Sequence, residues 1–390
     1  MHLSTLWFVI DALFWVGFFV LEGFDFGVGV LHSFVAKDDT ERRIAINSIG
    51  PVWDGNEVWL IVAGAVIFAA FPSWYATMFS TFYLALVVVL LALMVRGVAF
   101  EYQRKVDDPR WRAFFRWSLT IGSALIPLLV GVAFGDMLHG LPIDAAHNYT
   151  GNFFGLLTPY GLYTGVTMLV LTLLMGATYL SLKTVGDLHD RVVRLSGVIG
   201  WIAAVLVWGF VTWTHLGLGS GFVPNPLEVL AVLAVIASAW LANVKLEGWA
   251  FTAAAVGIAS TLGSLVLELY PRVMVSTTSH AYNLTVANSA SPSYTLRVMT
   301  VVAVIFFPVV LVYQGWTYHV FRGRLSAPRA GTAVAAGAGP DGDGGGDGGG
   351  DPVDVAPDTV ATRGSDDGPV PGADQAATDG QAVAGPTGGS

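Results

Sequence analysis

The sequence contains no cysteine. Without thiols the chain can form no disulfide, no thiolate-bound iron–sulfur cluster, no cysteine-ligated zinc site and no cysteine nucleophile. Charged residues are also scarce: they make up 12% of the 390 residues, whereas hydrophobic residues make up 54%. This balance differs from that of a soluble domain and indicates a protein that lies mainly in a membrane.

Long apolar runs follow one another along most of the chain. Spanning the hydrocarbon core of a bilayer takes about 20 mostly apolar residues. The runs that meet this requirement lie at 6–31, 51–70, 78–99, 118–138, 158–182, 197–215, 227–243, 250–270 and 297–321. Because the runs are continuous rather than alternating, a membrane β-barrel is excluded. We therefore predict an all-α polytopic membrane protein with nine transmembrane helices.

Lysine and arginine are nearly missing from every second connection. The odd-numbered connections and the segment after the last span hold sixteen of the nineteen, and the even-numbered connections hold only Arg272 and Arg297. Cytoplasmic loops carry the excess of lysine and arginine in membrane proteins. The bias predicts an N-terminus outside the cell and a cytoplasmic C-terminus.

The C-terminal part of the chain has a different composition. From 327 to 390 it is rich in Gly, Ala, Asp and Pro and contains no aromatic residue. Such a segment cannot bury enough apolar surface to offset its ordering entropy. We predict a transmembrane domain at 1–326 and a disordered cytoplasmic tail at 327–390.

Acidic residues interrupt the first two apolar runs. Glu22 and Asp25 lie three residues apart in the first, and Asp54 and Glu57 lie three apart in the second, so each pair is predicted to project from one helix face. Carboxylates inside a membrane cost roughly 2.5 to 3.5 kcal/mol each and call for an explanation. Since the two helices run in opposite directions, both pairs are expected in or near the inner third, beside Arg96 at the inner end of the third helix.

Two interpretations of these charges remain open. They can form a chain of titratable groups that admits protons from the cytoplasm, with Glu101 and Lys105 at its mouth. Alternatively, Arg96 pairs with one of the acids and locks three helices together, which is the favoured interpretation for that residue. For Asp25 and Asp54 the proton path is favoured. Asp11 and Glu268, toward the outer side, are each expected to be a hydrogen-bonded structural residue.

Histidine is missing from the middle of every predicted span. The eight histidines lie in connections or at helix ends, at 2, 32, 139, 147, 189, 215, 280 and 319. A haem buried in a helix bundle needs axial ligands at membrane depth. A redox function would therefore require cofactors held by another subunit. His215 is the one histidine that could be examined as a ligand, and a wet interfacial histidine is the favoured interpretation, so no metal site is predicted.

Several motifs occur in an order and spacing that resemble one known family, subunit II of the bd-type quinol oxidases. The likeness covers about residues 5–325. It rests on EGFDFGVG at 22–29, ERR at 41–43, GPVWDGNEVW at 50–59, FAAFP at 68–72, FS at 79–80, WR at 111–112, GNFF at 151–154, GATYL at 176–180 and TLRVM at 295–299.

The resemblance implies a terminal oxidase of the respiratory chain in the bacterial plasma membrane, which oxidises quinol and reduces dioxygen to water. It implies that haem b and haem d belong to the larger subunit I, and that this chain is a haem-free partner with no catalytic residue and no activity of its own. Expected partners are subunit I, quinone and lipid, with a structural quinone bound in some members. Small accessory subunits stay open, and no nucleic acid is expected.

The resemblance also links this subunit to proton uptake. The motif positions that it implicates are Asp54, Glu101 and Lys105. Together with the acids already described, the proton-path candidates are Asp54, Glu101, Lys105, Asp25 and Glu57. Structural or electrostatic roles are expected for Arg96, Trp53 and Glu22.

Two rival functions make different predictions. A secondary transporter also places acids inside spans and would carry substrate without a partner subunit. A pure assembly scaffold predicts that alanine at Glu22, Asp25, Asp54 or Glu57 changes the yield of a complex but not the turnover of each complex. The sequence leaves the identity of the quinol open.

Overall fold

The computed structural model describes residues 2–103, 105–218 and 223–325, which belong to one compact unit, Met1–Pro352. Within these residues, nine helices are long and apolar enough to cross a membrane. They are α1 (Leu3–Val35), α3 (Trp53–Ala70), α5 (Tyr83–Tyr102), α6 (Pro109–His139), α7 (Pro159–Lys183), α8 (Gly186–Gly217), α9 (Pro226–Asn243), α10 (Glu247–Leu269) and α12 (Ser293–Val320). The prediction of an all-α polytopic membrane protein is confirmed. The predicted tail at 327–390 lies outside the described residues.

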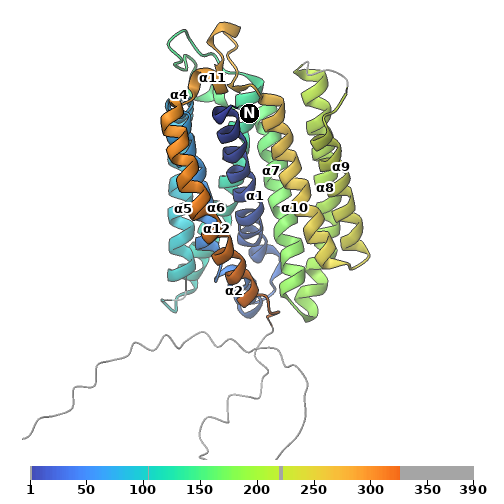
Figure 1. The fold of residues 1–390 in the computed structure, drawn as a ribbon. Coiled ribbons are helices and arrows are strands. Elements are labelled where there is room, and N and C mark those ends of the chain that lie inside the picture. Colours follow the sequence, from blue (N-terminus) through green and yellow to red (C-terminus); the bar gives the residue numbers. More distant parts are fainter. Residues whose placement is uncertain (1, 104, 219–222, 326–390) are drawn as a thin grey trace, which may run out of the picture. The chain divides into compact units, whose positions relative to one another are not determined.

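Some helices begin earlier than the apolar runs that predicted them, because polar turns extend these helices. The sixth span begins at Gly186 rather than at 197, and the fourth begins at Pro109 rather than at 118. These turns are too polar for the hydrocarbon core, but a helix can continue into the headgroup region. Successive spans alternate in direction, so Lys37, Lys105 and Lys183 lie at the same end of the bundle, here called the basic end (bottom of Figure 1).

The connections contain short elements that hydropathy did not predict. They are the helices α2 (Asp39–Ile49), α4 (Pro72–Thr81) and α11 (Val286–Ser289), the 3-10 helices η1 (Phe153–Leu156) and η2 (His280–Tyr282), and the strands β1 (Arg272–Met274) and β2 (Leu284–Thr285). The two strands pair antiparallel, with Arg272 opposite Thr285 and Met274 opposite Leu284. Each element is too short to give a hydropathy signal of its own.

Side-chain caps fix the start of α9. Asn225 Oδ1 accepts a hydrogen bond from the backbone N–H of Glu228, and the Glu228 carboxylate accepts one from the backbone N–H of Asn225. This reciprocal capping box satisfies two donors that the helix leaves unpaired, and Pro226 fits the first helical position because it lacks an N–H group there. The cap also fixes the position of the Glu228 carboxylate.

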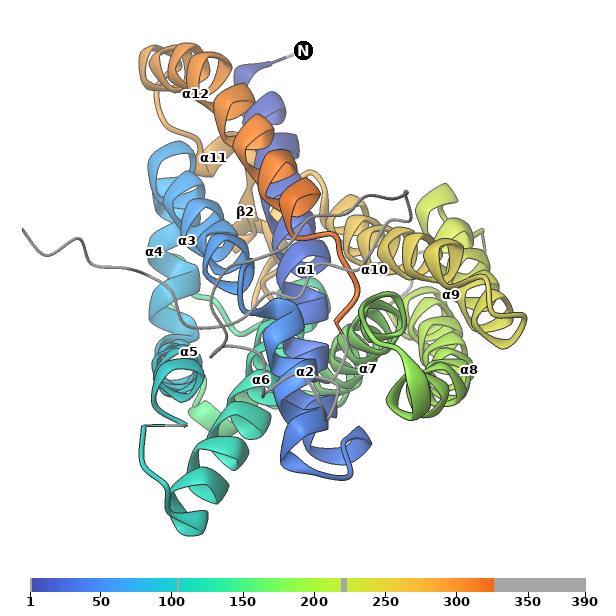
Figure 2. The same ribbon diagram turned by 90° about the horizontal axis from the view of Figure 1, so that it is seen from below.

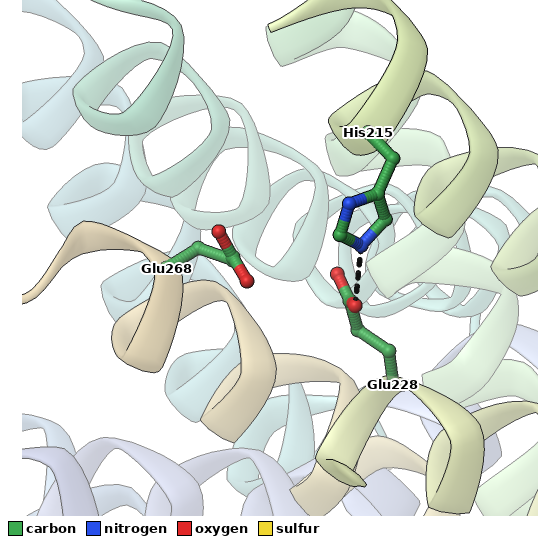
Figure 3. Close-up of side chains that lie close together, drawn as sticks. All are labelled: His215, Glu228 and Glu268. Carbon is green, nitrogen blue, oxygen red and sulfur yellow. Dashed lines mark hydrogen bonds and ion pairs between the residues drawn. The ribbon is translucent and has the colours of Figure 1, made fainter. Parts of the chain in front are cut away.

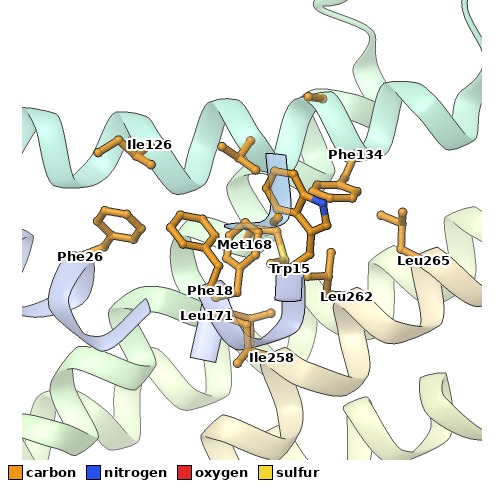
Figure 4. Packing of buried hydrophobic residues seen from close by; sticks show 14 of the residues in the cluster. Trp15, Phe18, Phe26, Ile126, Phe134, Met168, Leu171, Ile258, Leu262 and Leu265 are labelled. Atoms are coloured by element: carbon orange, nitrogen blue, oxygen red, sulfur yellow. The ribbon is translucent and has the colours of Figure 1, made fainter. Parts of the chain in front are cut away.

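Helix α1 is the centre of the bundle. It packs against α3, α6, α7 and α10 and, over a shorter length, against α12, while α8 and α9 lie on the far side of α7 and α10 (Figures 1 and 2). Aromatic side chains fill the space between α1 and α6: Trp15 meets Phe134 with ring centroids 4.9 Å apart, and Phe18 lies beside Trp15 (Figure 4). Lipid tails are as apolar as these side chains, so close packing rather than escape from water holds the helices together.

Glycines allow α1 and α7 to approach most closely. A Cβ atom on Gly27 would lie 2.7 Å from the Gly176 Cα atom and closer still to the Thr172 carbonyl oxygen. A Cβ atom on Gly176 would in turn meet the backbone of Gly27. Neither backbone can yield, so both positions require glycine at this contact.

We expect Gly27→Ala to destabilise the folded protein, because the added methyl group overpacks the α1–α7 contact, at a cost of about 1 to 3 kcal/mol. The thermal unfolding midpoint of the purified protein, with any partner subunit that copurifies, should fall. Gly248→Ala is the matched control, because a Cβ atom there meets nothing within 4 Å. Equal midpoints for the two variants would contradict this account of the contact.

Candidate functional site

A buried arginine joins three helices toward the basic end of the bundle. Arg96 on α5 is fully buried, and its Nη1 atom lies 2.5 Å from Glu22 Oε1 on α1 and 3.0 Å from Glu57 Oε2 on α3. The Arg96 ion pairs expected from the sequence are therefore present, with two acids rather than one. We call Glu22, Asp25, Asn56, Glu57 and Arg96 the acid–arginine cluster.

Asn56 connects this cluster to α12. Its Nδ2 group donates hydrogen bonds to Asp25 Oδ2, at 2.6 Å, and to the Leu21 carbonyl, at 3.1 Å. Its Oδ1 atom accepts hydrogen bonds from Gln314 Nε2, at 2.8 Å, and from the Tyr318 hydroxyl, at 2.7 Å. An asparagine can both donate and accept, so Asn56 fixes the Asp25 carboxyl and two side chains of α12 at once. Sequence reasoning missed Asn56, Gln314 and Tyr318, although the amide at 314 interrupts an apolar run.

Aromatic rings surround the buried guanidinium. The Arg96 Cζ atom lies 4.9 Å from the ring centroid of Phe26, 5.3 Å from that of Phe100 and 5.9 Å from that of Trp53. Trp53 stacks on Phe100 with centroids 4.7 Å apart. The negative faces of such rings stabilise a cation that has lost its water. The structure thus places Trp53 against Arg96, as one of the three rings that enclose the guanidinium group.

The cluster holds more acidic than basic groups. Glu22, Asp25 and Glu57 supply three carboxyl groups, and Arg96 is the one guanidinium that pairs with them among the described residues. No donor in the described part of the chain hydrogen-bonds Glu22 Oε2 or Asp25 Oδ1. Two uncompensated negative charges at this depth are costly. The arrangement can therefore take up and share protons as a coupled group.

The other predicted proton-path residues lie outside this cluster. Asp54, Glu101 and Lys105 are exposed, and within the described residues no hydrogen bond or ion pair joins any two of them. Lys105 Nζ instead lies 4.4 Å from the ring centroid of Tyr102. Asp54 and Glu57 are predicted to project from one helix face, but only the Glu57 carboxylate contacts Arg96, whereas Asp54 is exposed. Three residues along a helix leave about 60° between side chains, and Asp54 lies in the first turn of α3, at its exposed end.

A second polar cluster lies at the opposite end of the bundle. His215 on α8 is buried, and its Nε2 atom lies 2.6 Å from Glu228 Oε2 on α9 (Figure 3). The expectation of a wet interfacial histidine is wrong, because the side chain is buried and its Nε2 atom contacts Glu228, thirteen residues further along the chain. The hydrogen bond expected for Glu268 on α10 is present: its Oε1 atom accepts from Asn225 Nδ2 at 2.9 Å.

Comparisons with known proteins agree with one another. The family model for cytochrome bd terminal oxidase subunit II matches residues 3–321. The chain is 42% identical to the cytochrome bd ubiquinol oxidase subunit 2 of Bacillus subtilis, an alignment that covers 83% of this chain and 97% of that protein. It is 37% identical to the cytochrome bd-I ubiquinol oxidase subunit 2 of Escherichia coli K12, over 83% of this chain and 95% of that protein.

A solved structure of bd oxidase from Geobacillus thermodenitrificans has the same fold, with a TM-score of 0.63 and 17% sequence identity, over 82% of this chain and 99% of that chain. The matched family model covers the nine spans of the described residues and every residue of the acid–arginine cluster. The chain belongs to the cytochrome bd terminal oxidase subunit II family.

Proposed function

We propose that this chain is the haem-free subunit of a quinol:oxygen oxidoreductase in the bacterial plasma membrane, and that it admits protons from the cytoplasm to redox centres held by subunit I. The names of the two relatives, at 42% and 37% identity, support the oxidase. The acid–arginine cluster is the observation that carries the proton role. With the basic end cytoplasmic, as the lysine and arginine bias indicates, this cluster faces the side from which protons are drawn.

The placement of histidine supports a haem-free role. Every histidine in the described part of the chain lies in a connection or near a helix end. His189 and His215 face Glu247 and Glu228, and His32 Nδ1 contacts the Gly29 carbonyl. These donors do not fit a haem held by histidine at membrane depth. In the proposed complex, haem b and haem d of subunit I supply electron transfer from quinol and the reduction of dioxygen.

The proposed proton route runs from exposed to buried carboxyl groups. Asp54, Glu101 and Lys105 form its exposed mouth. Glu57 is the transition, because its side chain remains 22% exposed while its carboxylate already contacts Arg96. Arg96 Nη1 contacts both Glu57 and Glu22, so a proton that neutralises one acid frees the guanidinium to pair with the other. Asp25, held by Asn56, lies about one helical turn nearer the basic end than Glu22 on α1 and is a further acceptor.

The least buried helices mark the proposed contact with subunit I. Leu296 is the one described residue of α12 that is buried, and α3 and α5 also expose much of their apolar surface. These three helices carry or contact the acid–arginine cluster, and exposed Asp54 and Glu101 lie at the ends of α3 and α5. Docking of subunit I on α3, α5 and α12 would therefore bring its redox centres next to the proposed route.

The division of cofactors can be tested by absorption spectroscopy. The complex purified through this chain should show the bands of haem b and haem d, because subunit I copurifies with it. The same chain expressed without subunit I and purified in detergent should show neither band. A haem spectrum from the single chain would overturn the haem-free assignment.

We expect Asp54→Ala to lower oxidase turnover at least about tenfold while the haem content stays unchanged, since a positioned proton-transfer group contributes roughly 10²- to 10⁴-fold. Oxygen consumption for each haem d measures this. Asp187→Ala is the matched control, because Asp187 is also an exposed acid in the first turn of a helix at the basic end. Loss of haem with Asp54→Ala would show that Asp54 has a structural role instead. Unchanged turnover would favour the assembly scaffold as the function of this chain.

Arg96→Gln should lower the yield of haem-containing complex, because removing one partner of a buried ion pair costs roughly 3 to 5 kcal/mol. Adding Glu22→Gln to Arg96→Gln should restore part of the yield, since one unpaired acid is then removed. Arg194→Gln serves as control: Arg194 is exposed and makes no ion pair with the described residues. Equal yields for Arg96→Gln and Arg194→Gln would contradict the electrostatic role.

A further inference from the structure

We propose that His215, Glu228 and Glu268 bind a divalent transition-metal ion such as Zn²⁺ at the end of the bundle opposite the basic end. Each residue offers one ligand atom, and these atoms all lie within 4.8 Å of one another. The three residues come from α8, α9 and α10, and their polar groups point toward a common space (Figure 3). We call them the His–Glu–Glu site; the proton route proposed above does not include it.

The donor set fits zinc. Imidazole nitrogen and carboxylate oxygen bind Zn²⁺ at about 2.0 to 2.2 Å, so two ligands of one tetrahedral ion lie about 3.4 Å apart. In the structure, two of the ligand atoms lie closer together than this, because the His215 Nε2–H group donates to Glu228 Oε2 at 2.6 Å. A metal ion would replace this proton, which is released to solvent from an imidazolium and moves to Nδ1 in a neutral ring, and the two groups would move apart by rotation of their side chains. A neutral imidazole and two carboxylates then balance the charge of the ion.

One carboxylate oxygen has no hydrogen-bond partner among the described residues. Glu228 is fully buried, and no donor in the described residues hydrogen-bonds its Oε1 atom. Figure 3 shows this second oxygen on the side of the carboxylate that faces Glu268. Among described residues, no lysine or arginine forms an ion pair with Glu228 or Glu268. A buried oxygen of this kind is costly without a ligand, and a metal ion in that space would satisfy it.

Asn225 holds both carboxylates in place from outside the site. Its Nδ2 group donates to Glu268 Oε1 at 2.9 Å, and its backbone N–H donates to Glu228 Oε2 at 2.8 Å. Hydrogen bonds of this kind orient metal ligands before the ion arrives. The bound ion would connect the ends of α8, α9 and α10 through one residue from each helix.

The basic end supplies a matched comparison. There His189 Nε2 lies 2.9 Å from Glu247 Oε1, but Arg324 Nη2 donates to the other oxygen of Glu247 at 2.9 Å. The acid is thus already paired with a fixed cation. In the part of the chain that the structure describes, this pair has no third histidine or acid close enough to complete a metal site.

The test is zinc stoichiometry in the purified complex. The complex is stripped with EDTA, loaded with Zn²⁺, freed of excess metal and analysed by elemental mass spectrometry. The wild type should hold one more zinc for each complex than Glu228→Gln and His215→Gln, whereas Glu247→Gln should hold as much as the wild type. Asn225→Ala should weaken zinc binding about 10- to 100-fold, since it removes a support of the ligands rather than a ligand.

The haem spectrum and the thermal midpoint of each variant report its folding. If Glu228→Gln does not assemble, Glu268→Gln replaces it, because the Glu268 side chain is only partly buried and lies near the end of α10. X-ray absorption at the zinc edge should show nitrogen and oxygen ligands, including imidazole. A wild type that binds no more zinc than assembled Glu228→Gln, His215→Gln or Glu268→Gln would overturn the proposal.

Discussion

The ion pairs of Arg96 are the constraint on which the rest of the structure depends. A guanidinium at this depth needs nearby counter-charges, and it finds Glu22 on α1 and Glu57 on α3. Removing water strengthens each attraction and also raises the penalty for any partner that is lost. α1, α3 and α5 can therefore meet in few other arrangements. Phe26, Phe100 and Trp53 complete the enclosure.

Buried acidic groups have different partners at the two ends of the bundle. Toward the basic end, one arginine compensates several carboxyl groups incompletely, which leaves room for protons to bind. At the opposite end, Glu228 and Glu268 lie near His215. Among the described residues, no lysine or arginine forms an ion pair with either acid. A cluster with a fixed internal cation suits proton exchange. A cluster without one suits a cation supplied from solution.

Spacing in the sequence predicted only part of these sites. The acids Glu22 and Asp25 could be found because each interrupts an apolar run, and Arg96 stood out in the same way. Asn56, Gln314 and Tyr318 are uncharged, and polar residues of this kind do not disturb a hydropathy pattern enough to be singled out. The contact of His215 with Glu228 could not be predicted, because it depends on how α9 returns beside α8. Asp54 shares a motif with Glu57, yet its place in the first turn of α3 leaves it exposed.

The sequence by itself determined the number of spans, their alternation and the family. Apolar length must match the thickness of a bilayer, and basic residues remain on one side of it, so both properties can be read along the chain. Only the tertiary structure decided which polar atoms meet. The rotation and packing of the helices set those distances, and neither has a local signal. The partners of Arg96, the link from Asn56 to α12 and the His–Glu–Glu site therefore became visible only once the nine apolar helices of the described residues were packed together.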